Sequence, residues 1–121
     1  MSDATPRRGK TTIAPDVLLT IARLSALSVP GVARLSTVPG GVNRLFQRGV
    51  GDGVRIDVKD NAVRVDVYLI VAHVAQVHDV SRAVQSSVSR AIHEMVGMDV
   101  LGVNVHIEDV AFPAETSAQP E

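Results

Sequence analysis

An alternation of apolar and polar residues marks the stretch from Ala62 to Ala72 as the strand around which the chain is organised. A period of two is typical of a strand with one buried face and one solvent-exposed face. The run is long and rich in β-branched residues, which favours a central strand over an edge strand. The predicted buried face consists of Val63, Val65, Val67, Leu69 and Val71, and the residues between them include Arg64, Asp66 and Tyr68.

Shorter alternating segments predict three further strands. One runs from Val54 to Lys59, and the turn Asp60-Asn61 joins it to the central strand as a β-hairpin. Another, short, spans Val32 to Ser36. The closing strand is predicted to bury Leu101, Val103, Val105 and Ile107 and to expose Gly102, Asn104, His106 and Glu108.

Two helices are predicted from apolar residues at helical spacing. The first begins at Pro15, a favoured first helical residue, and ends near Ser28, because Val29 precedes a proline. The second begins at Val77 and ends before Gly97, a C-terminal cap residue. Their predicted core faces are Val17, Leu18, Ile21, Leu24 and Ser25 in the first, and Val80, Val84, Val88, Ala91, Ile92 and Met95 in the second.

These elements predict an α+β fold: a small sheet with a β-hairpin and a closing strand, with two helices packed on one face. We expect residues 1–8 to be a disordered tail, 9–112 a single domain and 113–121 a disordered acidic tail. The conformation of Thr37 to Gly53 stays open; a helical turn there would carry Leu45 and Phe46. The uncovered sheet face would present Arg55, Asp57, Lys59, Arg64, Asp66, Tyr68, Asn104, His106 and Glu108.

Composition narrows the possible functions. The 121 residues carry a net charge of −1, which does not favour a polyanion binder, and an aromatic content of 2% leaves few platforms for stacking bases. Cysteine is absent, so disulfides and thiolate sites are excluded. The sequence shows neither a signal peptide nor an apolar run of about 20 residues, so a cytoplasmic protein is expected.

The residue patterns point to no catalytic, cofactor or metal site. The four histidines show no zinc-type spacing on one helix, and Gly49-Val50-Gly51-Asp52-Gly53 lacks the lysine and hydroxyl of a phosphate-binding loop. No serine lies in a nucleophile-elbow motif. Arg55, Asp57, Arg64 and Asp66 are interpreted as cross-strand charge partners. An RNA-binding domain of the KH type stays an alternative, although the G-x-x-G loop that it needs is missing.

The ordered set of motifs resembles the alkaline shock protein family, the envelope stress response proteins of Gram-positive bacteria. The resemblance covers about Gly9 to Val110 and departs from the family at the strand-to-helix loop, where His73-Val74 and His78 replace a usual glycine and proline. The matching segments are Gly9-Lys10, Ile13, Pro15-Asp16-Val17, Pro30-Gly31-Val32-Ala33, Val63 to Leu69, Val80, Gln85, Val88, Met95-Val96-Gly97-Met98 and Val103 to Val110.

The resemblance implies a non-enzymatic protein without cofactors. Such proteins self-associate, and some are held at the membrane by a membrane-anchored relative, so a homo-oligomer and such a partner are expected. A nucleic-acid partner and direct insertion into the membrane are not expected. The alternative is a soluble regulator that binds a metabolic enzyme or RNA. The candidate interface comprises Arg64, Asp66, Tyr68, Asn104 and His106 on the open face, with Tyr68 as anchor, and Leu45 and Phe46 in the preceding loop.

Overall fold

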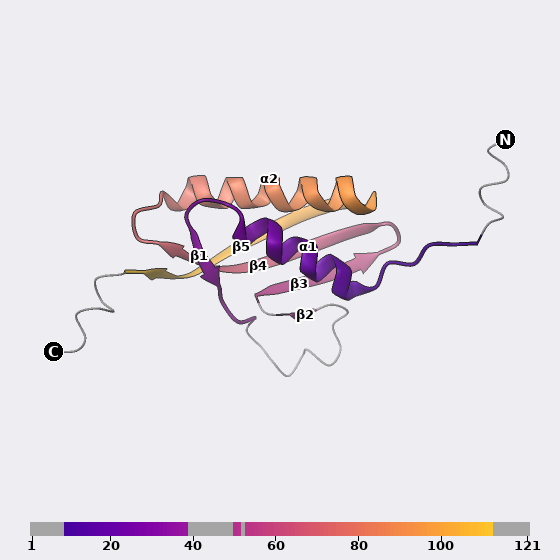
Figure 1. Cartoon of the computed structure of the whole chain (residues 1–121), viewed down its shortest axis with the longest axis horizontal. Coiled ribbons are helices and arrows are strands. Elements are labelled where there is room, and N and C mark those ends of the chain that lie inside the picture. The colour runs from indigo at the N-terminus through magenta and orange to yellow at the C-terminus, as the bar shows by residue number, and fades with distance from the viewer. Residues whose placement is uncertain (1–8, 39–49, 52, 113–121) are drawn as a thin grey trace.

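The computed structural model describes residues 9–38, 50–51 and 53–112, which form one sheet with both helices on the same side (Figure 1). This arrangement confirms the predicted α+β fold. In chain order the elements are α1 (Pro15–Leu27), β1 (Val32–Leu35), β2 (Val50–Gly51), β3 (Val54–Lys59), β4 (Ala62–Ala72), α2 (Val77–Val96) and β5 (Asp99–Ala111).

Strand β4 is paired along both of its edges. On one edge it meets β3 through the hairpin and β1 farther along, both antiparallel. On the other edge β5 runs parallel to it over its whole length. The parallel direction follows from the 20-residue helix α2, which carries the chain back to the start of β4 before β5 begins. The prediction of a central strand is therefore confirmed.

The hairpin turn lies where the sequence predicted it, and one further short strand is present. Asp60, at φ 60, is the first central residue of the two-residue hairpin and the only non-glycine with positive φ in the described part of the chain. This is the pattern of a II′-type turn. Strand β2 pairs with the outer edge of β3, although its residues were predicted to belong to the end of a glycine-rich loop.

The core lies between the sheet and the helices and is almost entirely aliphatic. Helix α2 buries Val80, Val84, Val88 and Ile92, as predicted, but the prediction was wrong for Met95, which is 69% exposed. The prediction was also partly wrong about which residues of helix α1 face the core. It buries Leu18, Ile21, Ala22 and Ala26, whereas Val17 and Leu24 are 44% and 56% exposed. The two alanines allow α1 to lie close to its neighbours, so its larger apolar residues divide between two sides.

The closing strand departs from the predicted alternation at its start. The pairing register with β4 shifts between Val63 and Arg64, so β5 has an extra residue there. Leu101 lies at this bulge and is 55% exposed, which corrects the prediction that it faces the core. Val100 packs partly buried against the core instead. A bulge re-aims side chains locally, and beyond it Val103 returns to the buried side as predicted.

A charge placed in the core should destabilise the fold strongly. Val88 is fully buried in α2, so Val88→Asp places a carboxylate without a partner among valines. We expect a loss of about 3 kcal/mol or more in the free energy of unfolding. Ser86→Asp, at an exposed position of the same helix, should change it by less than about 0.5 kcal/mol. Urea denaturation followed by circular dichroism measures both; equal stabilities would contradict the buried helix face.

Two glycines with nearly the same φ provide a matched test of close packing. Gly97 (φ 73) has open space where a Cβ would lie, whereas a Cβ on Gly53 (φ 76) would lie 2.5 Å from Leu35 Cβ and 2.8 Å from the Ser36 carbonyl oxygen. Gly97→Ala should lower the free energy of unfolding by about 1–2 kcal/mol, the cost of holding a residue with a Cβ in the left-handed backbone conformation. Gly53→Ala should cost clearly more, because β1 would have to move. Equal losses in thermal denaturation would show that Gly53 is not packed tightly against Leu35 and Ser36 at the end of β1.

Candidate functional site

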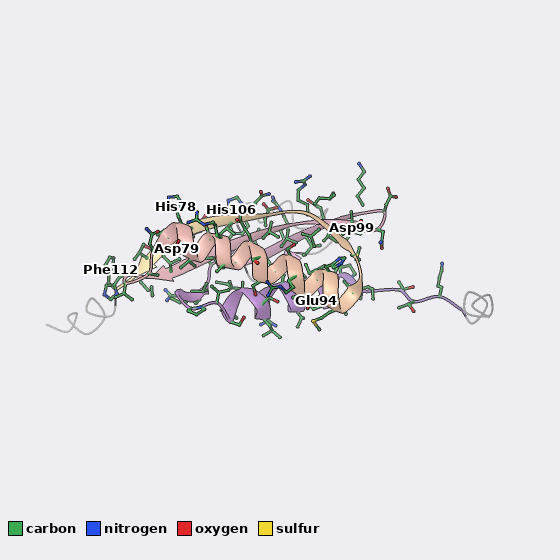
Figure 2. The ribbon with its side chains drawn as sticks, turned by 90° about the horizontal axis from the view of Figure 1, so that it is seen from above. His78, Asp79, Glu94, Asp99, His106 and Phe112 are labelled. Atoms are coloured by element: carbon green, nitrogen blue, oxygen red, sulfur yellow. The ribbon has the colours of Figure 1, made fainter. Side chains whose placement is uncertain are left out.

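The most structured polar feature is a cluster on the sheet face that the helices do not cover. The period of β4 places Asp66 and Tyr68 on this face, and the pairing registers bring residues of the neighbouring strands beside them. Arg55 of β3 is opposite Asp66, and Asn104 and His106 of β5 are opposite Asp66 and Tyr68. Three strands therefore contribute to one site. In Figure 2, β5 runs the length of the molecule from Asp99 towards Phe112, with His106 between them.

Asp66 is the centre of this cluster and the one charged residue in the described chain that is buried, with 6% of its surface exposed. Its Oδ1 accepts hydrogen bonds from Asn104 Nδ2 and His106 Nε2, both at 3.1 Å. Its Oδ2 accepts one from Arg55 Nη2 at 3.2 Å, which also makes an ion pair. Because Oδ1 can only accept, His106 carries its hydrogen on Nε2 in this arrangement.

Tyr68 is buried on the open face, contrary to expectation. It is 6% exposed, and its ring stacks on that of His106 with centroids 4.4 Å apart and 12° between the planes. It does not belong to the hydrophobic cluster beneath the helices. The prediction that the side chains of Asp66 and Tyr68 are exposed to solvent was therefore wrong. Stacking and hydrogen bonding between adjacent strands cover both side chains, which a simple period of two cannot foresee.

The environment of Asp66 stabilises its charged form. Burial by itself raises the pKa of this carboxyl group. The hydrogen bonds from His106, Asn104 and Arg55, together with the positive charge of Arg55, outweigh that effect, so the pKa lies below its usual value. The carboxylate is therefore ionised at neutral pH and is not adjusted to exchange protons there, as a general acid or base would be.

The cluster fits a structural framework better than a reactive or metal-binding one. Arg55 and Asp66 form the predicted cross-strand ion pair. Asp57 and Arg64 lie opposite each other in register, but they form no ion pair within the described chain. Nor do three or more potential metal ligands gather anywhere in the residues that the structure describes. Asp66 already satisfies both of its oxygens within the protein, so a metal ion would have to displace its partners.

The predicted interface residues divide into three groups. Arg64 and Asn104 are exposed, and His106 is half-buried. Asp66 and Tyr68 are buried beneath them, and Leu45 and Phe46 lie outside the described residues. Their role at an interface stays a prediction.

Two features escaped the analysis of the sequence. Arg55 was placed on the open face but not among the site residues. The available signal was the predicted hairpin, whose two-residue turn places Arg55 directly opposite Asp66. The second is the apolar outer side of α1. Its residues at helical spacing were assigned to the core, although α1 has more large apolar residues than one face can bury.

The chain belongs to the alkaline shock protein 23 family, described as having a cell envelope-related function; the family model matches residues 3–112. This confirms the resemblance seen in the motifs. The chain is also 32% identical over 113 residues to the uncharacterized protein YqhY of Bacillus subtilis (strain 168), covering 92% of this chain and 82% of that protein. No solved structure matches the chain. Neither helix in the described residues has the length and apolar character that crossing a membrane requires.

The Asp66 cluster should make stability depend on pH. A carboxyl group whose pKa is lower in the folded chain stabilises it above the unfolded pKa of about 3.9, and this contribution disappears as pH falls through the folded value. Asp66→Asn should therefore cost about 1–3 kcal/mol at pH 7, and the difference from the parent chain should shrink as the pH falls below about 4.

The exposed carboxylate of Asp57, on the same face, provides the control for this measurement. Asp57→Asn should change the free energy of unfolding by less than about 0.5 kcal/mol at either pH. Urea titrations at several pH values give all three curves. A loss for Asp66→Asn that is the same at neutral and acid pH would show that its charge does not contribute.

Proposed function

We propose that this chain is a non-enzymatic interaction protein of the cell envelope, which self-associates or docks on a membrane-anchored partner through its open sheet face. The family's envelope-related function supports the setting. The observation that carries the proposal is the Asp66 cluster, which holds a polar sheet face in one arrangement. The described chain shows no helix over this face (Figure 1).

Pre-ordered side chains make this face suitable for binding. Ordering a flexible side chain costs roughly 0.5–1.5 kcal/mol when it enters an interface. Here Arg55, Asn104 and His106 are already held by Asp66, so less of this cost remains when a partner binds. A buried, paired charge stabilises little by itself. Its retention on a sheet face is better explained by a requirement for defined side-chain positions.

Arg64 is the most accessible group of this surface that is suited to an interface. It is exposed on β4, and a Cβ on Gly102 of β5 would lie 3.2 Å from its Nη1. The guanidinium therefore extends over the adjacent strand at a residue without a side chain. A planar fork of donors in this position matches carboxylates of a partner. Glu108 and Asp57 are exposed on the neighbouring strands, so a partner with mixed charges fits best.

Reversal of the charge at Arg64 tests this proposal. Arg64→Glu should leave circular dichroism and thermal stability unchanged, since the side chain is exposed, but should weaken capture of envelope-associated proteins by about tenfold or more. The matched control is Arg90→Glu, which removes an exposed arginine from α2 on the other side of the sheet. Affinity capture of the tagged full chain, with quantitative mass spectrometry, compares the three proteins.

Three outcomes would count against the proposal. Identical capture by the parent chain and both variants would show that the open face is not the interface. An equal loss with Arg90→Glu would indicate a bulk charge effect instead. Specific recovery of RNA or of a metabolic enzyme would favour the regulatory alternative.

A further inference from the structure

Strand β5 lies at one edge of the sheet. Within the described chain it pairs only with β4, so its other edge has no strand beside it. It is 13 residues long, whereas β1 and β2, towards the opposite edge, have four and two residues. Natural sheets usually protect an edge with short strands, lysines or prolines, because its backbone groups can pair with another chain. Strand β5 contains neither lysine nor proline.

The pairing register decides which backbone groups of β5 point away from the sheet. Tyr68 of β4 makes its backbone hydrogen bonds on the side away from β5, to the residue just before β3 and the residue just after β1. In a parallel ladder, the residue opposite Tyr68 bonds to the residues before and after it. That residue is His106, so its groups face β4, and those of Val105 and Ile107 point outward. We call the outward N–H and C=O groups of Val105 and Ile107 the outer edge.

Side chains occupy the outward backbone groups just before and just after the outer edge. Before it, Gln85 Nε2 of α2 donates to the Val103 carbonyl oxygen at 3.2 Å. After it, the Val110 N–H donates to Asp109 Oδ1 at 2.8 Å. The outer edge itself takes part in no hydrogen bond among the residues that the structure describes. A row of two donors and two acceptors is therefore available between two capped positions.

The side chains beside the outer edge are apolar on the inner face of the sheet. Val105 and Ile107 are half-buried and pack against the hydrophobic core. Helix α2 runs along β5 in Figure 1, with β4 on the other side of the strand. A strand added at the outer edge would extend the sheet along this helix, and apolar residues on its inner face would continue the core.

The charges next to the outer edge are acidic. Glu108 and Asp109 follow it directly and are exposed, and β5 has no lysine or arginine. The guanidinium of Arg64 lies over Gly102, nearer the start of the strand. Lysine or arginine on an added strand would therefore be favoured at the end beside Glu108 and Asp109.

We propose that the outer edge binds an extended, basic segment of another protein, which pairs with β5 as an additional strand. Backbone hydrogen bonds provide the affinity in such pairing, and alternate side chains provide the selectivity. The segment would have apolar residues towards the core and lysine or arginine beside Glu108 and Asp109. A second copy of β5 does not fit, because it brings no lysine or arginine to these carboxylates. The inference concerns the edge of the sheet and not its open face, so it goes beyond the proposed function.

Amide hydrogen exchange in the full chain, followed by NMR, checks the outer edge directly. The N–H groups of Val105 and Ile107 should exchange faster than those of Asn104 and His106, which face β4. A bound strand should slow exchange at Val105 and Ile107 by about tenfold or more and leave the other two unchanged. Slow exchange at all four residues in the free chain would show that the outer edge is already occupied.

A synthetic, dye-labelled peptide of about eight residues, with alternating valine and lysine, serves as the probe. Fluorescence anisotropy with the full chain at up to about 1 mM should show binding. The same peptide with glutamate in place of lysine should bind about tenfold or more weakly, because it repels Glu108 and Asp109. Methylation of the backbone nitrogens of the lysine peptide should weaken binding by a similar factor, because it removes the hydrogen bonds to β5.

Variants of the chain locate the bound peptide. Val105→Pro removes one N–H of the outer edge, and proline is tolerated in an edge strand where the N–H faces solvent. It should weaken binding about tenfold or more while circular dichroism stays unchanged. Glu108→Lys should weaken it about tenfold. The matched control is Glu94→Lys, at an exposed residue half a turn around α2 from Gln85, which should bind like the parent.

The outcomes decide the inference apart from the proposed function. Absence of binding up to that concentration overturns it, as does equal binding of the three peptides or a folded Val105→Pro chain that binds like the parent. If Val105→Pro does not fold, the methylated peptide on the parent chain decides instead. Loss of partner capture by Arg64→Glu without peptide binding overturns the inference alone. Edge-dependent peptide binding with capture unaffected by Arg64→Glu supports the inference and counts against the open face.

Discussion

The pairing of β4 along both edges is the constraint on which the rest of the structure depends. A strand with two hydrogen-bonded edges has no freedom to shift its register, because a shift by one residue would move its valines from the core to the open face. The hairpin sets the register on one side, and the crossover through α2 sets it on the other. With β4 fixed, its alternate residues define both the aliphatic core and the polar site.

Asp66 adds an electrostatic requirement to this backbone constraint. A buried carboxylate is tolerated only when it is paired and hydrogen-bonded, and its three donors come from both neighbouring strands. The side chains around Asp66 can therefore take their positions only when β3, β4 and β5 are correctly aligned. This is why we regard the face as an ordered surface, and why an arginine such as Arg64 at its rim is suited to recognition.

Helix α1 packs on the core partly through small residues. Its small residues, Ala22 and Ala26, are fully buried in the core. Its larger residues Val17, Leu24 and Leu27 lie on the outer side and stay partly exposed. The open sheet face lies on the side of the molecule away from both helices (Figure 1).

The sequence by itself determined the elements other than β2, their order and the resemblance to the family. Period-two valines, the Pro15 start, the Gly97 end and the Asp60-Asn61 turn are local signals, and they predicted the α+β fold with both helices on one face. Only the tertiary structure decided which residues meet. The parallel pairing of β5 stacks His106 on Tyr68, its bulge exposes Leu101, and packing through alanines leaves Val17 and Leu24 outside. These outcomes depend on register and on contacts between segments far apart in the chain, which residue periodicity does not contain.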